Sequence, residues 1–302
     1  MRISTSWNQQ LGVNAMLDQQ SKLSQTQLKL SSGKKYLTPS ENAVAATGLI
    51  DLQQNIKENQ QYQRNIGVAR QRLSLQESSL QNATETVQRI RELAVQGLND
   101  SNTPENRKQI AIEIDELNKQ LLSIANTQNA NGEYIFSGYK SDTPPFSNQL
   151  GYSYNGESAS WRSVEIGPNR TVTDGDPGDE VFGIVLTGSL TPGNIDNVFQ
   201  AVGQLSNDLK ANKPDSNSLA DLDAVLKRFE ITRASTGARL NALDNQENLN
   251  ADYILTNQST ASEIGDLDYA DALSKFNLQQ ISLQAAQQAF TKVQNLSLFN
   301  YL

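Results

Sequence analysis

Hydrophobic residues recur every seven positions near both ends of the chain. Close to the N-terminus, Met16, Leu23 and Leu30 form one such row. A second row near the C-terminus is longer and consists of Tyr269, Phe276, Leu283 and Phe290, and three of its members are followed three residues later by Ala272, Ala286 and Val293. Seven-residue spacing places side chains along one face of a helix, which is typical of helices that wrap around other helices. The pattern predicts two terminal helices, which could pair within one chain or with copies of it.

The final residues are unusually apolar. Phe299, Tyr301 and Leu302 have nothing after them to cover them, and exposed apolar groups usually mark an interface. This favours contact between subunits over a helical hairpin that is closed within one chain. The predicted assembly interface consists of Met16, Leu23, Leu30, Tyr269, Phe276, Leu283, Phe290, Val293, Phe299, Tyr301 and Leu302.

The rest of the N-terminal half also has a helical pattern. A first helix over about 8–32 should end at Gly33, which can adopt the left-handed cap conformation. Ser40 is the expected N-cap of a long second helix that runs to about residue 98. Its apolar row comprises Leu52, Ile66, Leu73, Leu80, Val87 and Ala94. Thr103-Pro104 predicts the start of a third helix, which ends near residue 128.

Helical periodicity returns in the C-terminal half. The predicted helices cover about 196–210, 218–258 and 267–296, and Gly265-Asp266 forms a joint before the last of them. The middle helix of the three carries an apolar row that polar residues interrupt. These interruptions are Arg233, Thr236, Glu247 and Asn250.

Between the two helical halves the composition changes. Residues 132–192 are rich in Gly, Pro, Ser, Tyr and β-branched residues. Short strands are predicted at 134–136, 152–154, 161–166 and 181–186. Asn155-Gly156 is a typical hairpin turn. The segment therefore predicts a small β-rich head.

Together these patterns predict a mainly α protein, a long helical coiled-coil rod with a small β-rich head domain inserted between its N- and C-terminal helical halves. The expected domains are a terminal coiled-coil assembly domain (1–40 and 260–302), a helical rod domain (41–131 and 193–259) and the head domain (132–192). The composition agrees with helices that each bury one stripe. Hydrophobic residues make up 37% and aromatic residues 6%, while Asn and Gln reach roughly a fifth of the chain.

Charge and residue content argue against several functions. The formal net charge is −8 and no basic stripe is present, so neither nucleic acid nor an anionic membrane is an expected partner. No apolar run approaches the ~20 residues that span a bilayer, and residues 1–7 lack a secretory apolar core. The chain has no His and no Cys, which removes the common triads and zinc sites. We therefore expect no catalytic site, no metal and no cofactor.

Clustered acidic residues are the first candidates for chemistry. The loop 173–180 suggests calcium, but it fails the EF-hand spacing, and a solvated surface turn is favoured. Carboxylates on the helices suggest glycosidase chemistry, although solvated helix faces are favoured. They are Glu113, Asp115, Glu116, Asp221 and Asp223.

Aromatic residues of the predicted head are the second candidate. Trp161, with Tyr152 and Tyr154, could form a platform for a sugar ring. The core of a small β domain is the favoured interpretation.

Several motifs resemble the bacterial flagellin superfamily. On the N-terminal side they are 30–34 (LSSGK), 39–43 (PSENA) and 89–96 (RIRELAVQ), and on the C-terminal side 238–244 (ARLNALD) and 266–270 (DLDYA). The resemblance covers roughly 1–140 and 218–302. Within the superfamily the chain is most similar to the hook–filament junction proteins. That similarity lies in 132–138 (GEYIFSG) with Pro145-Phe146, and in the ending 293–302.

The resemblance implies a structural component of the bacterial flagellum, a ring of copies that connects hook to filament by polymerisation through the terminal helices. It implies as partners the chain itself, a neighbouring hook-associated protein and flagellin, together with a cytoplasmic export chaperone on the C-terminal helix. Type III export would place the protein outside the cell, in the flagellum. One alternative is a flagellin filament subunit, and a second is an adhesin or hydrolase borne by the head.

Overall fold

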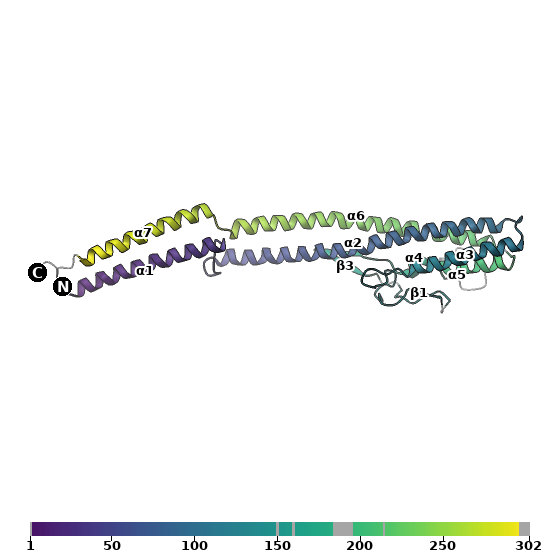
Figure 1. Cartoon of the computed structure of the whole chain (residues 1–302), viewed down its shortest axis with the longest axis horizontal. Helices are drawn as coiled ribbons and strands as arrows, with labels where there is room; N and C mark the ends of the chain where they lie inside the picture. Colours follow the sequence, from purple (N-terminus) through teal and green to yellow (C-terminus); the bar gives the residue numbers. More distant parts are fainter. Residues whose placement is uncertain (1, 149–150, 159–160, 184–195, 214, 296–302) are drawn as a thin grey trace. The chain divides into compact units, whose positions relative to one another are not determined.

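The computed structural model of this chain describes residues 2–148, 151–158, 161–183, 196–213 and 215–295. The described part is mainly helical with a few short strands, as the sequence predicts (Figure 1). The long helices are α1 (Arg2–Ser32), α2 (Ala43–Leu98), α3 (Pro104–Ala125), α5 (Val198–Lys210), α6 (Asn217–Gly265) and α7 (Tyr269–Asn295). None of the described helices is long and apolar enough to cross a membrane.

The helix ends follow local chemistry. Helix α1 ends at Ser32, and the φ of 68° at the following Gly33 confirms the predicted left-handed cap. Thr103 caps α3 as predicted, because its side chain accepts a hydrogen bond from the Asn106 backbone N–H. The predicted cap of α2 is wrong. Asn42 Oδ1 accepts from the Ala45 N–H at 3.0 Å, whereas Ser40 is hydrogen-bonded to Thr38.

The strands differ from the prediction. Strand β1 (Phe146–Ser147) pairs with β2 (Ser153–Tyr154), and β3 (Ser163–Gly167) pairs with β4 (Arg170–Thr173), both antiparallel. Residues 134–136 form no strand, and their one ladder contact is an isolated bridge from Tyr134 to Gln128.

Two further details of the head prediction are wrong. The predicted strand at 181–186 begins inside the short helix α4 (Gly178–Phe182), and its residues after 183 lie outside the described part of the chain. Asn155-Gly156 does not connect two paired strands, because β2 pairs with the strand that precedes it. Residues 168–169 turn the β3–β4 hairpin instead.

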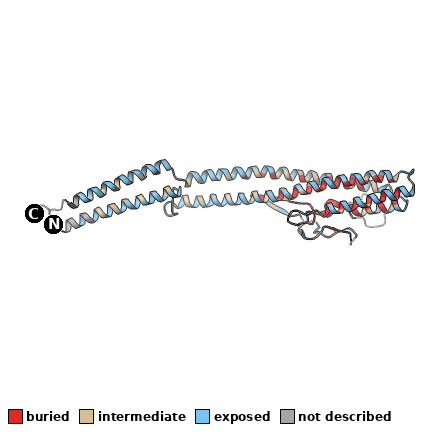
Figure 2. Cartoon of the chain, in the orientation of Figure 1, coloured by how far each residue is buried: buried red, intermediate tan, exposed pale blue. Residues whose placement is uncertain are grey.

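By backbone contacts the chain divides into two compact units, residues 1–58 with 252–302 and residues 59–251. The second unit contains the large core, where α3 packs against α5. The predicted α2 row is buried there from Ile66 to Ala94. Burial concentrates in this unit (Figure 2).

Aromatic rings fill the centre of the second unit. Five phenylalanines are fully buried: Phe136, Phe146, Phe182, Phe199 and Phe229. Phe136 and Phe182 meet edge to face, with ring centroids 5.2 Å apart, a geometry that aromatic quadrupoles favour. The insertion contributes Phe136, Phe146 and Phe182, so it shares one core with the helices.

Candidate assembly interface

Helices α1 and α7 pack side by side in antiparallel fashion (Figure 1). Two contacts define their register. Gly12 lies against the ring of Phe290, so that a Cβ added there would be 3.1 Å from Phe290 Cδ2. At the other end, the same construction at Gly33 falls 2.9 Å from Tyr269 Oη. Glycine thus allows close approach at both ends of the pair.

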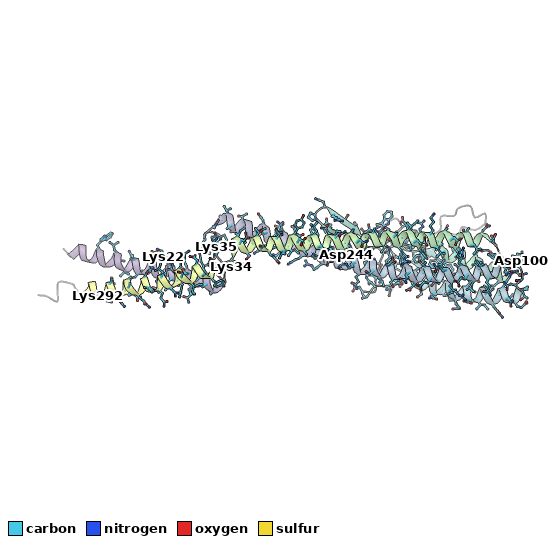
Figure 3. The ribbon with its side chains drawn as sticks, turned by 90° about the horizontal axis from the view of Figure 1, so that it is seen from above. Lys22, Lys34, Lys35, Asp100, Asp244 and Lys292 are labelled. Atoms are coloured by element: carbon cyan, nitrogen blue, oxygen red, sulfur yellow. The ribbon has the colours of Figure 1, made fainter. Side chains whose placement is uncertain are left out.

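The links that join these helices to α2 and α6 are tied together by backbone hydrogen bonds. The Lys35 N–H donates to Gly265 O at 2.8 Å, and the Leu267 N–H donates to Gly33 O at 2.9 Å. Lys34 and Lys35 mark this joint in Figure 3. Nearby, Lys29 binds Glu41 at 2.6 Å, and this hydrogen bond lowers the pKa of the Glu41 carboxyl. The predicted joint at Gly265-Asp266 is therefore present, and backbone hydrogen bonds hold it to the link that follows α1.

The predicted interface residues lie along the α1–α7 seam but are only partly buried there. Six of them are half-buried: Met16, Leu23, Leu30, Phe276, Leu283 and Phe290. Tyr269 is 57% exposed. The side chain of Val293 and residues 299, 301 and 302 lie outside the described part of the chain. Among the described side chains of both helices, only Ala272 is buried.

A second set of apolar side chains on these helices remains exposed when α1 packs on α7, and we call it the second apolar surface. On α1 it comprises Trp7, Leu11, Leu17 and Leu28, and on α7 it comprises Leu273, Leu278 and Ile281. Each of these side chains is at least half exposed. The sequence analysis missed them because they fall outside the seven-residue rows. Plotting the residues of each helix around its axis, at 100° per residue, would have shown these apolar side chains outside the seam.

Few charges accompany this surface. Besides the Lys29–Glu41 pair at the joint, the ion pairs described on α1 and α7 are Lys22 with Asp18 and Lys275 with Asp271, each within one helix and largely exposed. Such pairs contribute little to stability. Helices with exposed apolar side chains and few charges can approach similar helices without strong repulsion, so the pair is suited to contact with further helices.

The candidate acidic sites are occupied by protein partners. Asp223 binds Arg91, Glu113 binds Arg89, Asp115 binds Lys210 and Glu116 binds Lys119. Burial raises the pKa of Asp221, and nearby Asp215 adds to the shift. Among the described residues, no group of His, Cys, Asp and Glu is arranged to hold a metal ion.

The loop 173–180 is not the solvated turn that the sequence predicted. Asp174 is fully buried and binds Arg162, with the shorter contact at 2.6 Å. Asp176 is 7% exposed and binds Arg239 at 2.8 Å. Buried carboxylates require such partners. Asp176 thereby attaches the insertion to α6. The Asp174–Arg162 pair lies within the insertion, and Arg72 of α2 lies 3.6 Å from Asp174.

The polar interruptions of α6 bind both the insertion and α2. Asn250 Nδ2 donates to Ile166 O at 2.8 Å, and Gln76 Nε2 donates to Thr236 Oγ1 at 3.1 Å. Arg233 pairs with Glu77 of α2. Sequence reasoning recorded these residues only as breaks in an apolar row. Their spacing was the signal that another element packs on α6.

Comparison with known proteins gives consistent matches. Residues 3–141 match the bacterial flagellin N-terminal helical region, and residues 219–302 match the bacterial flagellin C-terminal helical region. Flagellar hook-associated protein 3 of Escherichia coli is 31% identical over 99% of both chains. The protein of that name from Salmonella typhimurium is 28% identical, again over 99% of both.

Solved structures share the fold. A putative flagellar hook-associated protein from Vibrio parahaemolyticus matches with a TM-score of 0.65 and 24% identity, over 75% of this chain and all of that one. The flagellar junction protein FlgL from Legionella pneumophila matches with a TM-score of 0.59 and 23% identity, over 72% of this chain and all of that one.

Proposed function

The chain belongs to the bacterial flagellin family, and we propose that within it this protein is the hook-associated junction component that connects hook to filament. The observation that carries the proposal is the 31% identity to flagellar hook-associated protein 3, which extends over 99% of both chains. A match of this extent includes the segment between the two flagellin regions, which the family models leave unmatched. It favours the junction role over the filament subunit and over a head-borne adhesin or hydrolase.

The mechanism that we propose is packing. Helices α1 and α7 leave their seam half-buried and the second apolar surface exposed. Helices from neighbouring copies would cover both. Association costs translational and conformational freedom, and burial of apolar area between subunits offsets that cost.

The interface residues follow from this mechanism. We propose the predicted set, Met16, Leu23, Leu30, Tyr269, Phe276, Leu283, Phe290, Val293, Phe299, Tyr301 and Leu302, as contacts between subunits. To it we add the exposed residues Leu278 and Ile281 of α7. Those two are available for a neighbour without disturbing the contact between α1 and α7.

At the level of domains, we propose an assembly domain (1–40 and 260–302), a coiled-coil rod (41–131 and 193–259) and an inserted head (132–192). Residues 1–40 and 260–302 fall within one compact unit, which supports treating them together. The head shares its aromatic core with the helices, so we expect it to depend on them for folding.

The partners and location are proposed on the same basis. They are further copies of the chain, a neighbouring hook-associated protein and flagellin, with a cytoplasmic export chaperone that holds the C-terminal helix before assembly. Type III export would deliver the chain to the extracellular flagellum. The role is structural, without catalysis.

Addition to isolated hooks tests the junction proposal. Hooks are incubated with excess purified protein, and the length of the layer that the protein adds to the hook end is measured by electron microscopy. A junction protein should add a limited layer and stop, because its function is to end one structure and begin another. Unlimited elongation would identify a filament subunit, and failure to add at all would refute the proposal.

A matched pair of substitutions tests the interface. Ile281→Gln removes an apolar side chain that is 64% exposed on α7, and Ile112→Gln removes one that is 60% exposed on α3. Neither should change the stability of the free chain. We expect Ile281→Gln to reduce incorporation at the hook by about tenfold or more, which corresponds to ~1.4 kcal/mol, and Ile112→Gln to leave it unchanged. Equal incorporation of both variants would exclude this face of α7.

A further inference from the structure

A cleft of about 460 Å³ opens between the insertion and α6 in the unit of residues 59–251. Its volume lies in the range of small-molecule sites. The residues that matter for its chemistry are Trp161, Asp176, Glu180, Arg228, Ile231 and Arg239. The first three come from the insertion, and the others come from α6.

The floor of the cleft is fixed by hydrogen bonds. Asp176 accepts from Arg239 at 3.0 and 2.8 Å and from Gln76 Nε2 at 2.6 Å. Its backbone N–H donates to Gln76 Oε1 at 3.1 Å. The Asp176 side chain is only 8% exposed. These groups are therefore held in place before any ligand arrives, which lowers the cost of binding.

The rim of the cleft is apolar and open. Trp161 is 45% exposed and Ile231 is 60% exposed. The other aromatic residues considered with Trp161 are used inside the protein, since Tyr152 stacks on Phe199 and Tyr154 packs on Phe146. The sequence-based assignment of Trp161 to a β-domain core is therefore wrong. An indole with an exposed face is a large apolar contact surface that the fold leaves unused.

Two charged groups of the cleft lack a bonded partner among the described residues. Asp176 and Arg239 satisfy each other, whereas the Glu180 carboxylate and the Arg228 guanidinium form no described ion pair or hydrogen bond. Burial raises the pKa of Glu180 and the nearby Asp179 adds to the shift, while the positive charges of Arg228 and Arg239 oppose it. Glu180 offers acceptors and Arg228 offers donors, both beside an aromatic face.

The balance of charge indicates the class of ligand. The two acids and two arginines of the cleft sum to zero, so neither an anion nor a cation is favoured overall. A neutral sugar ring presents an apolar C–H face and hydroxyl groups that both donate and accept. We propose that this cleft binds a neutral saccharide, with its ring on Trp161 and its hydroxyls hydrogen-bonded to Glu180 and Arg228. This binding function is additional to the junction role and does not depend on it.

Tryptophan fluorescence gives a local readout in the full-length protein. The chain has two tryptophans, Trp7 and Trp161, so the Trp7→Phe variant reports on Trp161 alone. This variant is titrated with cellobiose, maltose and N,N′-diacetylchitobiose to about 10 mM, which detects a Kd in the millimolar range. At least one disaccharide should change the emission of Trp161 in a saturable way.

Substitutions in the Trp7→Phe background then test the assigned contacts. Glu180→Gln and Arg228→Gln should each weaken binding by about tenfold. The controls are Glu230→Gln and Lys227→Gln, which alter exposed charges on α6 outside the cleft lining and should leave binding unchanged. Circular dichroism verifies that every variant is folded.

Three results would overturn the proposal. One is no saturable response to any of the disaccharides. Another is binding that persists in both cleft variants. The third is an emission change that depends on protein concentration without sugar and is lost in the cleft variants, which would show that another copy of the chain occupies the cleft.

Discussion

At the residue scale, single positions fix how the terminal pair is connected. Gly33 combines a φ of 68° with close approach to the Tyr269 hydroxyl. An L-residue in this conformation costs about 1–2 kcal/mol, and its Cβ would lie 2.9 Å from the Tyr269 hydroxyl, which would have to shift. Both penalties act on the pairing of α1 with α7.

We therefore expect Gly33→Ala to destabilise the terminal pair by about 1–2 kcal/mol. The control is Gly48→Ala, because Gly48 lies inside α2 with no atom near its missing Cβ. That change should stabilise the helix by about 0.5–1 kcal/mol. Thermal melts followed by circular dichroism should move in opposite directions for the two variants. A shared direction would contradict the role assigned to Gly33.

In the unit of residues 59–251, the buried side chain of Arg107 holds the C-terminal end of α2 in place through hydrogen bonds. It is 7% exposed, and its guanidinium donates to Gly97 O at 3.1 Å, Asn99 O at 3.2 Å and Asn212 Oδ1 at 2.6 Å. The first two acceptors are carbonyls at the C-terminal end of α2, where a positive charge is favourable.

Arg107→Ala should lower the free energy of unfolding by about 3 kcal/mol, because it leaves several acceptors without a partner. Arg107→Lys should recover only part of this loss, since an ammonium cannot reproduce the planar fork. Lys108→Ala changes the exposed neighbouring residue and should stay within about 0.5 kcal/mol of the parent. Urea denaturation measures all three. A small loss in Arg107→Ala would show that water replaces the guanidinium.

At the element scale, the long helices were predictable and the short elements were not. The apolar row of α2 repeats over many turns, so the pattern identifies both the helix and its buried face. Helix α4 has five residues, too few for periodicity to distinguish a helix from a strand. Strands β1 and β2 have two residues each and depend on contacts distant in sequence.

The candidate interface was predictable in part for a related reason. The seven-residue rows identify the seam because α1 and α7 pack on each other along it. The second apolar surface has no partner within the described part of the chain, and its residues do not form a regular row. The attachment of the insertion was also missed, since Asp174 and Asp176 are polar residues buried by long-range pairing. The polar interruptions of the α6 row indicate that another element packs there, but nothing near Asp174 or Asp176 in the sequence identifies their distant partners.

Acidic residues lie at the end of α5, at the start of α6 and in the turn between them, and their protonation should affect stability. Burial raises the pKa of Asp208 and of Asp221, and Asp215 raises both further. A carboxyl whose pKa is higher in the folded state binds its proton more tightly when folded. The free-energy cost of ionising this carboxyl in the folded protein is absent at low pH, where the group is protonated, and it appears as the pH rises through the titration range of the group.

Asp221→Asn should accordingly raise the free energy of unfolding at pH 7. The gain should vanish near pH 3, which is below the ordinary Asp pKa of about 3.9. Asp223→Asn is the control, because Asp223 is paired with Arg91 and its removal should give no gain. Urea denaturation at the two pH values measures the difference. A gain that persists at low pH would exclude charge as its cause.

At the scale of the whole molecule, burial is distributed unequally between the two units. Residues 59–251 hold most of the fully buried side chains, whereas Ala272 is the only buried residue among the described side chains of α1 and α7 (Figure 2). Isolated helices are marginal in water without a packed face. The terminal pair should therefore be the less stable part of the free chain, and assembly should stabilise it.

Deletion of residues 267–302 tests this division. Helix α7 is removed, and α1 loses the helix on which it packs. The circular dichroism signal should fall by the helix content of both, 27 and 31 residues, because α1 alone cannot bury its apolar row. The cooperative urea transition of the 59–251 core should remain at the same urea concentration as in the full chain.

The truncated protein should stay a folded monomer and fail to add to hooks. Retention of α1 helicity would show that α1 is stable without α7, and normal incorporation at the hook would show that assembly does not use the C-terminal helix.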